Sequence, residues 1–253
     1  WHLRNQGQSG GIWPGYRPEG WTNGFLRTFF WQSFSWIEVD ANTERFYNET
    51  AELQLTHYKE KKHGQWVDTP HHRAQPVHMI FDAITCQHNK LVTEVMSWNP
   101  VVRGYQWSDD NSVEVEKGWI QKADTIEELA VLIGRDPARL RAAVDRYNAA
   151  CEAGEDPDFG RNPDTLYPIA QGPFYAWRID PVIVCTGGGA RRNIKSEVLD
   201  HHGAPIPRLY EAGELGSMFS DLYQNGSYLT EAMISGRAAG REIVGLAPWE
   251  DAR

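Results

Sequence analysis

Two helix signatures stand next to each other between residues 125 and 151, and they constrain the fold more than any other feature of the sequence. In "DTIEELAVLIG", Thr125 and Glu128 form an S/T-x-x-E capping box, and Gly134 marks the helix end. In "RDPARLRAAVDRYNAAC", Asp136 is an N-cap and Pro137 takes the first helical position. The apolar residues at helical spacing, which we expect to face a core, are Ile126, Leu129, Ala130, Ile133, Leu140, Val144 and Tyr147. The segment therefore predicts two short helices that meet at a turn.

Strand patterns precede these helices. Residues 35–49, "SWIEVDANTERFYNE", alternate around a polar step and predict a hairpin. Residues 51–75 are polar and basic, which predicts a surface helix followed by a loop. The apolar run "PVHMIFDA" at residues 76–83 predicts a short buried strand.

The chain changes character after the two helices. Within residues 174–216, the stretches "FYAWRI", "VIVCT", "SEVLD" and "PRLYEAG" predict short strands separated by glycine and proline. From Leu229 to Val244 a further helix is predicted. The mixture predicts an α+β fold with a boundary near residues 170 to 185.

Aromatic side chains are concentrated in the first forty residues. The Gly, Pro and Asn content between Pro14 and Asn23 predicts loops, so these aromatics cannot all lie on one helix face. We expect them to form a pocket or an interface. They are Trp1, Trp13, Tyr16, Trp21, Phe25, Phe29, Phe30, Trp31, Phe34 and Trp36.

The composition supports a globular chain and disfavours two classes of partner. With 253 residues and 41% hydrophobic content the chain can bury a sizeable core. Its net charge is −9 and it has no Lys/Arg-rich run, which disfavours nucleic acid and anionic membrane surfaces as partners. No stretch reaches the roughly 18 apolar residues of a membrane span.

The sequence also lacks the common catalytic and metal-binding motifs. Its three cysteines are far apart and its histidines have no partners at ligand spacing, so no metal site is indicated. No G-x-S-x-G elbow or Walker loop occurs. In "TGGGARRN", Arg192 stands where the third glycine of a dinucleotide fingerprint belongs, which favours a tight turn over a phosphate loop.

The segment "LYEAGELGSMFSDLYQNGSYLTEAMISGRAAG" remains as the candidate for chemistry. It predicts a strand, a glycine turn with the acidic Glu214, a loop and then a helix with unsatisfied N–H groups. Such a helix start suits an anionic or polar ring edge. A capped helix packed on a strand, with no ligand, explains the same pattern.

Seven motifs in one order carry a family resemblance. They are "RFYNE", "KADTIEELA", "RYNAACEAGEDPDFGR", "GPFYA", "TGGG", "GAPIPRLYEAGE" and "NGSYLTEAMISGRAAG". In this order they resemble the C-terminal part of FAD-dependent oxidoreductases of the fumarate reductase flavoprotein and 3-ketosteroid 1-dehydrogenase type. The resemblance covers roughly residues 10 to 247.

The resemblance implies a mobile capping domain that interrupts a Rossmann-like FAD-binding domain. Residues 11–184 would be the substrate capping domain, and residues 185–247 the C-terminal segment of the FAD-binding domain. The family's N-terminal βαβ part has no counterpart in this chain, which does not begin with Met. We therefore expect a fragment, a processed piece or a subunit. An upstream segment or a second polypeptide would then carry the FAD phosphate-binding unit.

The family also implies roles for individual residues. The residues it would place against FAD are Glu214, Ser227, Tyr228, Leu229, Thr186, Gly187 and Gly188. Glu214 matches the acid that holds ribose or ribityl hydroxyls. The helix start matches the one that faces the pyrimidine edge of the isoalloxazine, where it would stabilise negative charge on the reduced ring. The "TGG" turn matches one near flavin and substrate.

At three positions this sequence differs from the substrate-binding residues of the fumarate reductases. Fumarate reductases carry an Arg, a His and a second Arg where this chain has Leu53, Val184 and Tyr223, so a dicarboxylate would be poorly held. The ketosteroid dehydrogenases place a Tyr near the position of Tyr223. A neutral phenol of pKa about 10 can donate to a carbonyl oxygen and stabilise an enolate-like state.

These matches and departures predict a flavin-dependent oxidoreductase. It would dehydrogenate or reduce a carbon–carbon bond next to a carbonyl-type group, on an apolar or aromatic substrate that is not a dicarboxylate, by hydride transfer at the flavin. Tyr223 is the first candidate for the proton-transfer group, and Tyr16 and Tyr47 are candidates for the second. The alternative is a non-catalytic cap or assembly subunit that completes a partner's flavin site. The sequence leaves the compartment open.

Overall fold

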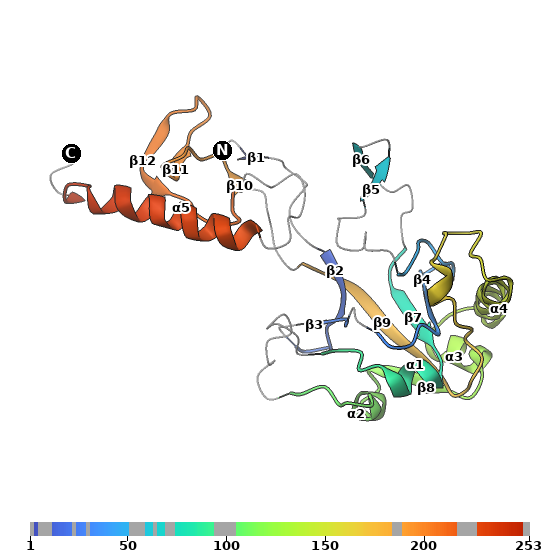
Figure 1. Cartoon of the computed structure of the whole chain (residues 1–253). Coiled ribbons are helices and arrows are strands. Elements are labelled where there is room, and N and C mark those ends of the chain that lie inside the picture. Colours follow the sequence, from blue (N-terminus) through green and yellow to red (C-terminus); the bar gives the residue numbers. More distant parts are fainter. Residues whose placement is uncertain are drawn as a thin grey trace. The chain divides into compact units, whose positions relative to one another are not determined.

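The computed structural model describes residues 3–4, 12–21, 24–28, 31–50, 59–62, 65–68, 74–93, 105–183, 189–216 and 227–249. Contacts within the chain divide it into two units (Figure 1). The first unit consists of Trp1–Ile12, Leu55–Glu60 and Ile183–Arg253, and the second of Trp13–Gln54 and Lys61–Val182. Among the described residues, no helix is long and apolar enough to cross a membrane.

The second unit is built around a six-stranded sheet of order β3-β2-β9-β7-β4, in which β8 also pairs with β9. Its strands are β2 (Ile12–Tyr16), β3 (Phe25–Leu26), β4 (Trp36–Val39), β7 (Val77–Phe81), β8 (Ile120–Ala123) and β9 (Phe174–Ile183). β7 pairs antiparallel with both β4 and β9, and β8 pairs antiparallel with β9. The predicted strand at residues 76–83 is confirmed as β7, which is buried throughout.

Both faces of this sheet carry a core, because successive strand residues point to opposite sides. On β9, Tyr175 and Trp177 join an aromatic-rich cluster, whereas Ala176 between them joins an aliphatic one. β7 divides in the same way, with Met79 in the aromatic-rich cluster and Ile80 in the aliphatic one. The sheet of this unit is therefore sandwiched between two packed layers.

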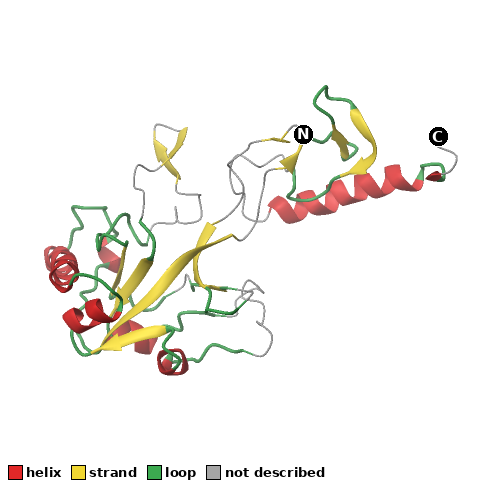
Figure 2. Ribbon diagram, turned by 180° about the vertical axis from the view of Figure 1, so that it is seen from behind, coloured by secondary structure: helices red, strands yellow, loops and turns green. Residues whose placement is uncertain are grey.

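The aliphatic layer contains the helices that the sequence predicts. α3 (Ile126–Leu132) begins at the Thr125 capping box, and α4 (Pro137–Ala153) begins at the Asp136 cap. Figure 2 shows these helices beside the sheet. The predicted inward residues that lie fully buried are Ile126, Leu129, Ala130, Leu140, Val144 and Tyr147. Both helix predictions are confirmed.

The aromatic layer changes the interpretation of the N-terminal aromatics. Of the described ones, Phe25, Trp31 and Trp36 are buried in the core, and Tyr16, Trp21 and Phe34 pack against it. The prediction of a pocket or interface is wrong for the buried three. Tyr16 and Trp21 do line a pocket of about 590 Å³. Trp1, Trp13, Phe29 and Phe30 lie outside the residues whose side chains are described.

The hairpin predicted over residues 35–49 is wrong. β4 forms, but residues 45–49 are not a strand, and β4 pairs instead with β7. The Asp40 carboxylate accepts hydrogen bonds from the Asn42 and Glu44 amides, which closes a tight turn. Beyond it, the Glu49 carboxylate accepts from the Glu38 N–H at 3.3 Å. A side chain thus occupies the position that a returning strand's carbonyl would take.

Two further predictions are corrected. The surface helix predicted within residues 51–75 is wrong where the structure describes that stretch, since β5 (Lys59–Lys62) and β6 (Gln65–Asp68) form a two-stranded sheet. Two residues separate these strands and one is glycine, which favours a hairpin over a helix. The two strands expected around Pro181 are one strand, β9, which continues to Ile183.

Short helices complete the second unit. α1 (Ala83–His88) is capped by Asp82, whose carboxylate also accepts hydrogen bonds from the Ala170 and Gln171 amides at 3.1 Å. α2 (Ser112–Glu116) and a 3-10 turn at Pro163–Thr165 lie in the connections.

The first unit combines small sheets with one long helix. β1 (Leu3–Arg4) pairs antiparallel with β10 (Gly189–Ala190), and β11 (Glu197–Leu199) pairs antiparallel with β12 (Pro205–Tyr210). Figure 2 shows α5 (Ser227–Val244) running beside the β11–β12 ribbon. The predicted C-terminal helix is confirmed, and it begins two residues earlier than expected.

Candidate functional site

The structure describes residues 211–216 after β12, a segment that carries Glu214 and that we call the glycine loop. Gly213 and Gly216 have φ angles of +85° and +69°, in the left-handed region that glycine adopts most easily. The two glycines therefore bend the chain on both sides of Glu214, whose side chain is half-buried.

The backbone of this loop lies directly against β10. A Cβ atom on Gly216 would stand 2.3 Å from the Ala190 carbonyl oxygen, and one on Gly189 would stand 2.4 Å from the Gly216 nitrogen. Both distances are shorter than real Cβ contacts. Glycine is therefore required at both positions for close backbone contact between the two segments.

The same loop is attached to α5. The Gly213 N–H donates to Ser235 Oγ at 2.9 Å, and the Ser196 hydroxyl donates to the Ser235 carbonyl oxygen at 2.9 Å. Tyr228 is buried on this side of the helix. The glycine loop, Ser196 just before β11, and α5 are thus connected within the first unit.

Arg192 binds the loop from the other side. Its Nη1 donates to the carbonyl oxygens of Glu211 and Leu215, at 3.3 and 3.0 Å. Its Nη2 donates to the Gly213 carbonyl oxygen at 3.1 Å and to Glu231 Oε1 at 2.6 Å. One guanidinium therefore joins three alternate carbonyls of the loop to a carboxylate of α5.

Glu211 is buried at the base of the loop with 7% of its surface exposed. Neither carboxylate oxygen accepts a hydrogen bond of ordinary geometry from the described residues. Burial raises the pKa of Glu211, although the Arg192 charge and the Ala190 N–H act in the opposite direction. The site thus contains an acidic group whose neutral form is favoured relative to an exposed glutamate.

The start of α5 supplies hydrogen-bond donors. The first N–H groups of any helix have no acceptor inside it, and here they belong to Ser227, Tyr228 and Leu229. The Leu229 side chain is 68% exposed. A helix start suits an electron-rich edge of a ligand, and a half-buried carboxylate such as that of Glu214 suits ligand hydroxyl groups.

Several residues predicted to line the flavin or substrate site lie outside the part of the chain that the structure describes. Tyr223, Thr186, Gly187 and Gly188 lie outside the described residues, as do Leu53 and Val184.

Tyr16 and Tyr47 are described and lie in the second unit. Tyr47 donates to Glu38 Oε2 at 2.5 Å, and burial followed by the Glu38 charge raises its pKa well above the usual value. Glu38 is itself fully buried and paired with Arg27. Tyr16 instead lines the pocket of about 590 Å³, and its pKa is raised mainly by burial. Tyr16 therefore faces space that a ligand can enter, whereas Tyr47 is part of a buried polar network.

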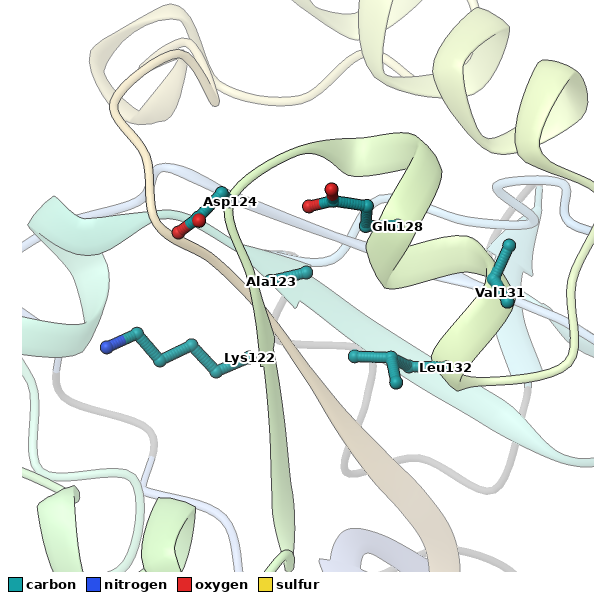
Figure 3. A pocket seen from close by; sticks show the side chains of 6 residues that line it. All are labelled: Lys122, Ala123, Asp124, Glu128, Val131 and Leu132. Atoms are coloured by element: carbon teal, nitrogen blue, oxygen red, sulfur yellow. The ribbon is translucent and has the colours of Figure 1, made fainter.

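A pocket of about 510 Å³ beside α3 carries no comparable chemistry. Figure 3 shows its lining residues, with the Lys122 side chain extending away from Glu128. The Glu128 carboxylate already accepts the Thr125 N–H in the capping box.

Sequence reasoning did not identify the roles of Arg192, Glu211, Glu231 and Ser235. In the sequence, the only local signal at Arg192 is that it interrupts a glycine pattern. Its contacts come from residues that are 19 to 39 positions away, and no local spacing signals them.

Two curated proteins are similar to this chain over about half of its length. The digoxin reductase of Eggerthella lenta is 42% identical over 131 residues, which is 51% of this chain and 23% of that protein. The vinyl phenol reductase of Lactiplantibacillus plantarum is 38% identical over 136 residues, or 52% of this chain and 28% of that protein. The chain thus spans about a quarter of the length of these curated relatives.

A solved structure is similar in fold. The 3-ketosteroid delta1-dehydrogenase of Sterolibacterium denitrificans, in complex with 1,4-androstadiene-3,17-dione, aligns with a TM-score of 0.65 at 23% identity. The alignment covers 92% of this chain and 43% of that one. A family model described as an FAD binding domain matches residues 32–228, which is more than half of the chain. The chain therefore belongs to the FAD binding domain family, in agreement with the flavoprotein resemblance that its seven motifs carry.

Proposed function

We propose that the complete protein is a flavin-dependent oxidoreductase that reduces or dehydrogenates a carbon–carbon bond next to a carbonyl-type group. The observation that carries the proposal is the joining of the Glu214 loop, β10 and α5 in one unit, with the contact to α5 made at Ser235. Membership of an FAD-binding family supports FAD as the ligand of this arrangement.

The residues of the first unit fit part of an FAD molecule. Glu214 would accept hydrogen bonds from ribose or ribityl hydroxyls, and the amides at the start of α5 would face the pyrimidine edge of the ring. Tight contact between Gly189 and Gly216 would hold the loop in the shape that this needs. Bound FAD would supply hydride transfer, which side chains cannot perform alone.

The substrate we propose is apolar or aromatic and is not a dicarboxylate. Leu53, Val184 and Tyr223 stand where fumarate reductases use cations, and without cations a pair of carboxylates would lose its charge-assisted hydrogen bonds. The names of the two curated relatives, digoxin reductase and vinyl phenol reductase, support this class. The N-terminal aromatics add little support, since several of the described ones fill the core.

Proton transfer would use tyrosine. Tyr223 would donate a hydrogen bond to the substrate carbonyl and stabilise an enolate-like state. Of the two candidates for a second group, Tyr16 is favoured over Tyr47, because the Tyr47 hydroxyl already donates to the buried Glu38.

We further propose that residues 11–184 form a mobile substrate cap and that residues 185–247 return to the FAD domain. The division of contacts between Val182 and Ile183 supports this arrangement. The FAD phosphates would be bound by an upstream segment or by a second polypeptide.

The surface of α5 supports a missing neighbour. Its buried side, which includes Tyr228, Ser235 and Ala239, packs inward. A second stripe at helical spacing is apolar and exposed, and consists of Leu229, Met233, Gly236, Gly240 and Val244. Gly236 and Gly240 have open space around them, so another backbone can approach closely. A helix that is apolar on two sides is typical of a domain interior.

The alternative is that the chain is a non-catalytic cap or assembly subunit that completes a partner's flavin site. The lack of a recognisable phosphate loop in the sequence and the exposed stripe of α5 favour this alternative as well.

The catalytic proposal is tested with Tyr223→Phe in the complete protein. Turnover with a conjugated ketone or an aryl alkene is expected to fall by 100-fold or more, in line with the loss of a positioned acid. Tyr167→Phe is the control, because Tyr167 is an exposed tyrosine of the second unit. Fumarate is expected to be a poor substrate. Unchanged turnover in Tyr223→Phe would refute the role of Tyr223, and faster turnover with fumarate would refute the substrate class.

A further inference from the structure

Arg192 makes contacts that alternate along the glycine loop. It donates to the carbonyl oxygens of residues 211, 213 and 215, which leaves Glu214 between two anchored carbonyls. Because the peptide units on both sides are held, the backbone direction at Glu214 is held as well. Gly213 is held a second time, through its N–H on Ser235 Oγ.

The charge of Arg192 is balanced within the fold. Its side chain is 9% exposed and that of its partner Glu231 is 7% exposed. A buried guanidinium needs such a partner, because an unpaired buried charge is costly. Glu231 lies on α5, so the ion pair connects the loop to the same helix whose first amides face the proposed ligand.

Lysine could not make this set of contacts. Arginine presents five donors in a planar fork, whereas lysine is a point charge with three donors. In the described structure four hydrogen bonds leave two guanidinium nitrogens, in directions that a single ammonium group cannot cover.

We propose that Arg192 is a positioning residue that sets FAD affinity by fixing Glu214 relative to the start of α5. This inference depends on the proposed function. Arg192 does not touch the ligand in the proposed arrangement. It acts through the backbone of residues 213–215, and its effect therefore depends on the Glu214 carboxylate.

The test is a double-mutant cycle on the FAD dissociation constant of the complete protein, measured by flavin fluorescence. Arg192→Lys and Glu214→Gln are each expected to weaken FAD binding about tenfold, the scale of one charge-assisted hydrogen bond. The double variant is expected to remain within about threefold of either single variant, since Arg192 acts through Glu214.

Arg208→Lys is the matched control. Arg208 also donates to backbone carbonyls, those of Ala247 and Pro248, but it does not contact the glycine loop in the described structure. This variant is expected to change FAD affinity by less than about twofold.

The cycle separates positioning from general damage. A fold that is merely weakened would bind FAD less tightly in both Glu214 backgrounds, and the two losses would then multiply to about 100-fold. Multiplied losses, or unchanged FAD affinity in Arg192→Lys, would overturn the inference. If Arg192→Lys does not fold, Ser235→Ala takes its place, with the same coupling to Glu214→Gln expected. A wild-type protein that has no affinity for FAD would overturn the proposed function itself.

Discussion

At the scale of single residues, glycine is needed in the glycine loop more for close backbone contact than for its positive φ angles. Several glycines of this chain have a positive φ angle, and they differ in what surrounds them. Gly203, at φ +86°, has no atom within 4 Å of the place where a Cβ would be. Gly216 is in contact with the Ala190 carbonyl oxygen. The same backbone angle therefore implies different costs of substitution.

Gly216→Ala is expected to lower the free energy of unfolding by about 3 kcal/mol or more. The left-handed backbone costs roughly 1–2 kcal/mol for an alanine, and displacement of the Ala190 carbonyl adds to that cost. Gly203→Ala is the control, with an expected loss of only about 1 kcal/mol. Urea unfolding of both variants checks the difference, and equal losses would contradict the close contact.

His78 predicts a pH dependence of stability. Burial, followed by the charges of Arg135 and Arg178, lowers the pKa of this histidine from 6.5 to about 4. Arg135 Nη2 lies 3.4 Å from His78 Nδ1, an arrangement that suits a neutral ring. A lowered pKa means that the unfolded chain binds the proton first. The contribution of neutral His78 to the free energy of unfolding is therefore present above pH 6.5 and is lost as the pH falls toward 4.

Between pH 7 and pH 4, the wild-type protein is expected to lose about 3 kcal/mol more stability than His78→Gln, which does not titrate there. Urea unfolding at both pH values measures the difference. A parallel decline in the two proteins would show that His78 does not contribute.

At the scale of elements, local signals predicted what local interactions determine. Thr125, Glu128 and Asp136 cap α3 and α4 through neighbours three residues away, so their sequence pattern was sufficient. The hairpin at residues 35–49 could not be predicted in the same way. The pairing of β4 is decided by the Glu49 side chain on one edge and by β7 on the other, and β7 begins almost thirty residues after Glu49.

The exposed apolar stripe of α5 predicts how a charge placed there changes the stability of the complete protein. In the complete protein, Met233→Lys is expected to lower the free energy of unfolding by about 2 kcal/mol or more, because the charge would be buried without a partner. Thr230→Lys is the control, since Thr230 lies outside the stripe and is also exposed. Differential scanning calorimetry compares the two. Equal melting temperatures would mean that the stripe remains in water.

At the scale of the whole molecule, seven motifs in one order indicated a flavoprotein family, and the match to the FAD binding domain family confirms it. The cofactor-binding role of Glu214 stays a prediction that its motif supports. The roles of Arg192 and Glu231 could not be predicted, because they arise only when three separate segments of the first unit meet. Contacts between such distant segments produce no recurring spacing in the sequence from which they could be predicted.

The most direct test of the central claim, that this chain supplies one part of an FAD site, is a visible absorption spectrum. The purified 253-residue chain is compared with the same chain purified together with a polypeptide that carries the FAD phosphate-binding unit. We predict flavin bands only in the second sample. Flavin bands in the single chain would contradict the need for a second part, and their absence from both samples would contradict the flavin site itself.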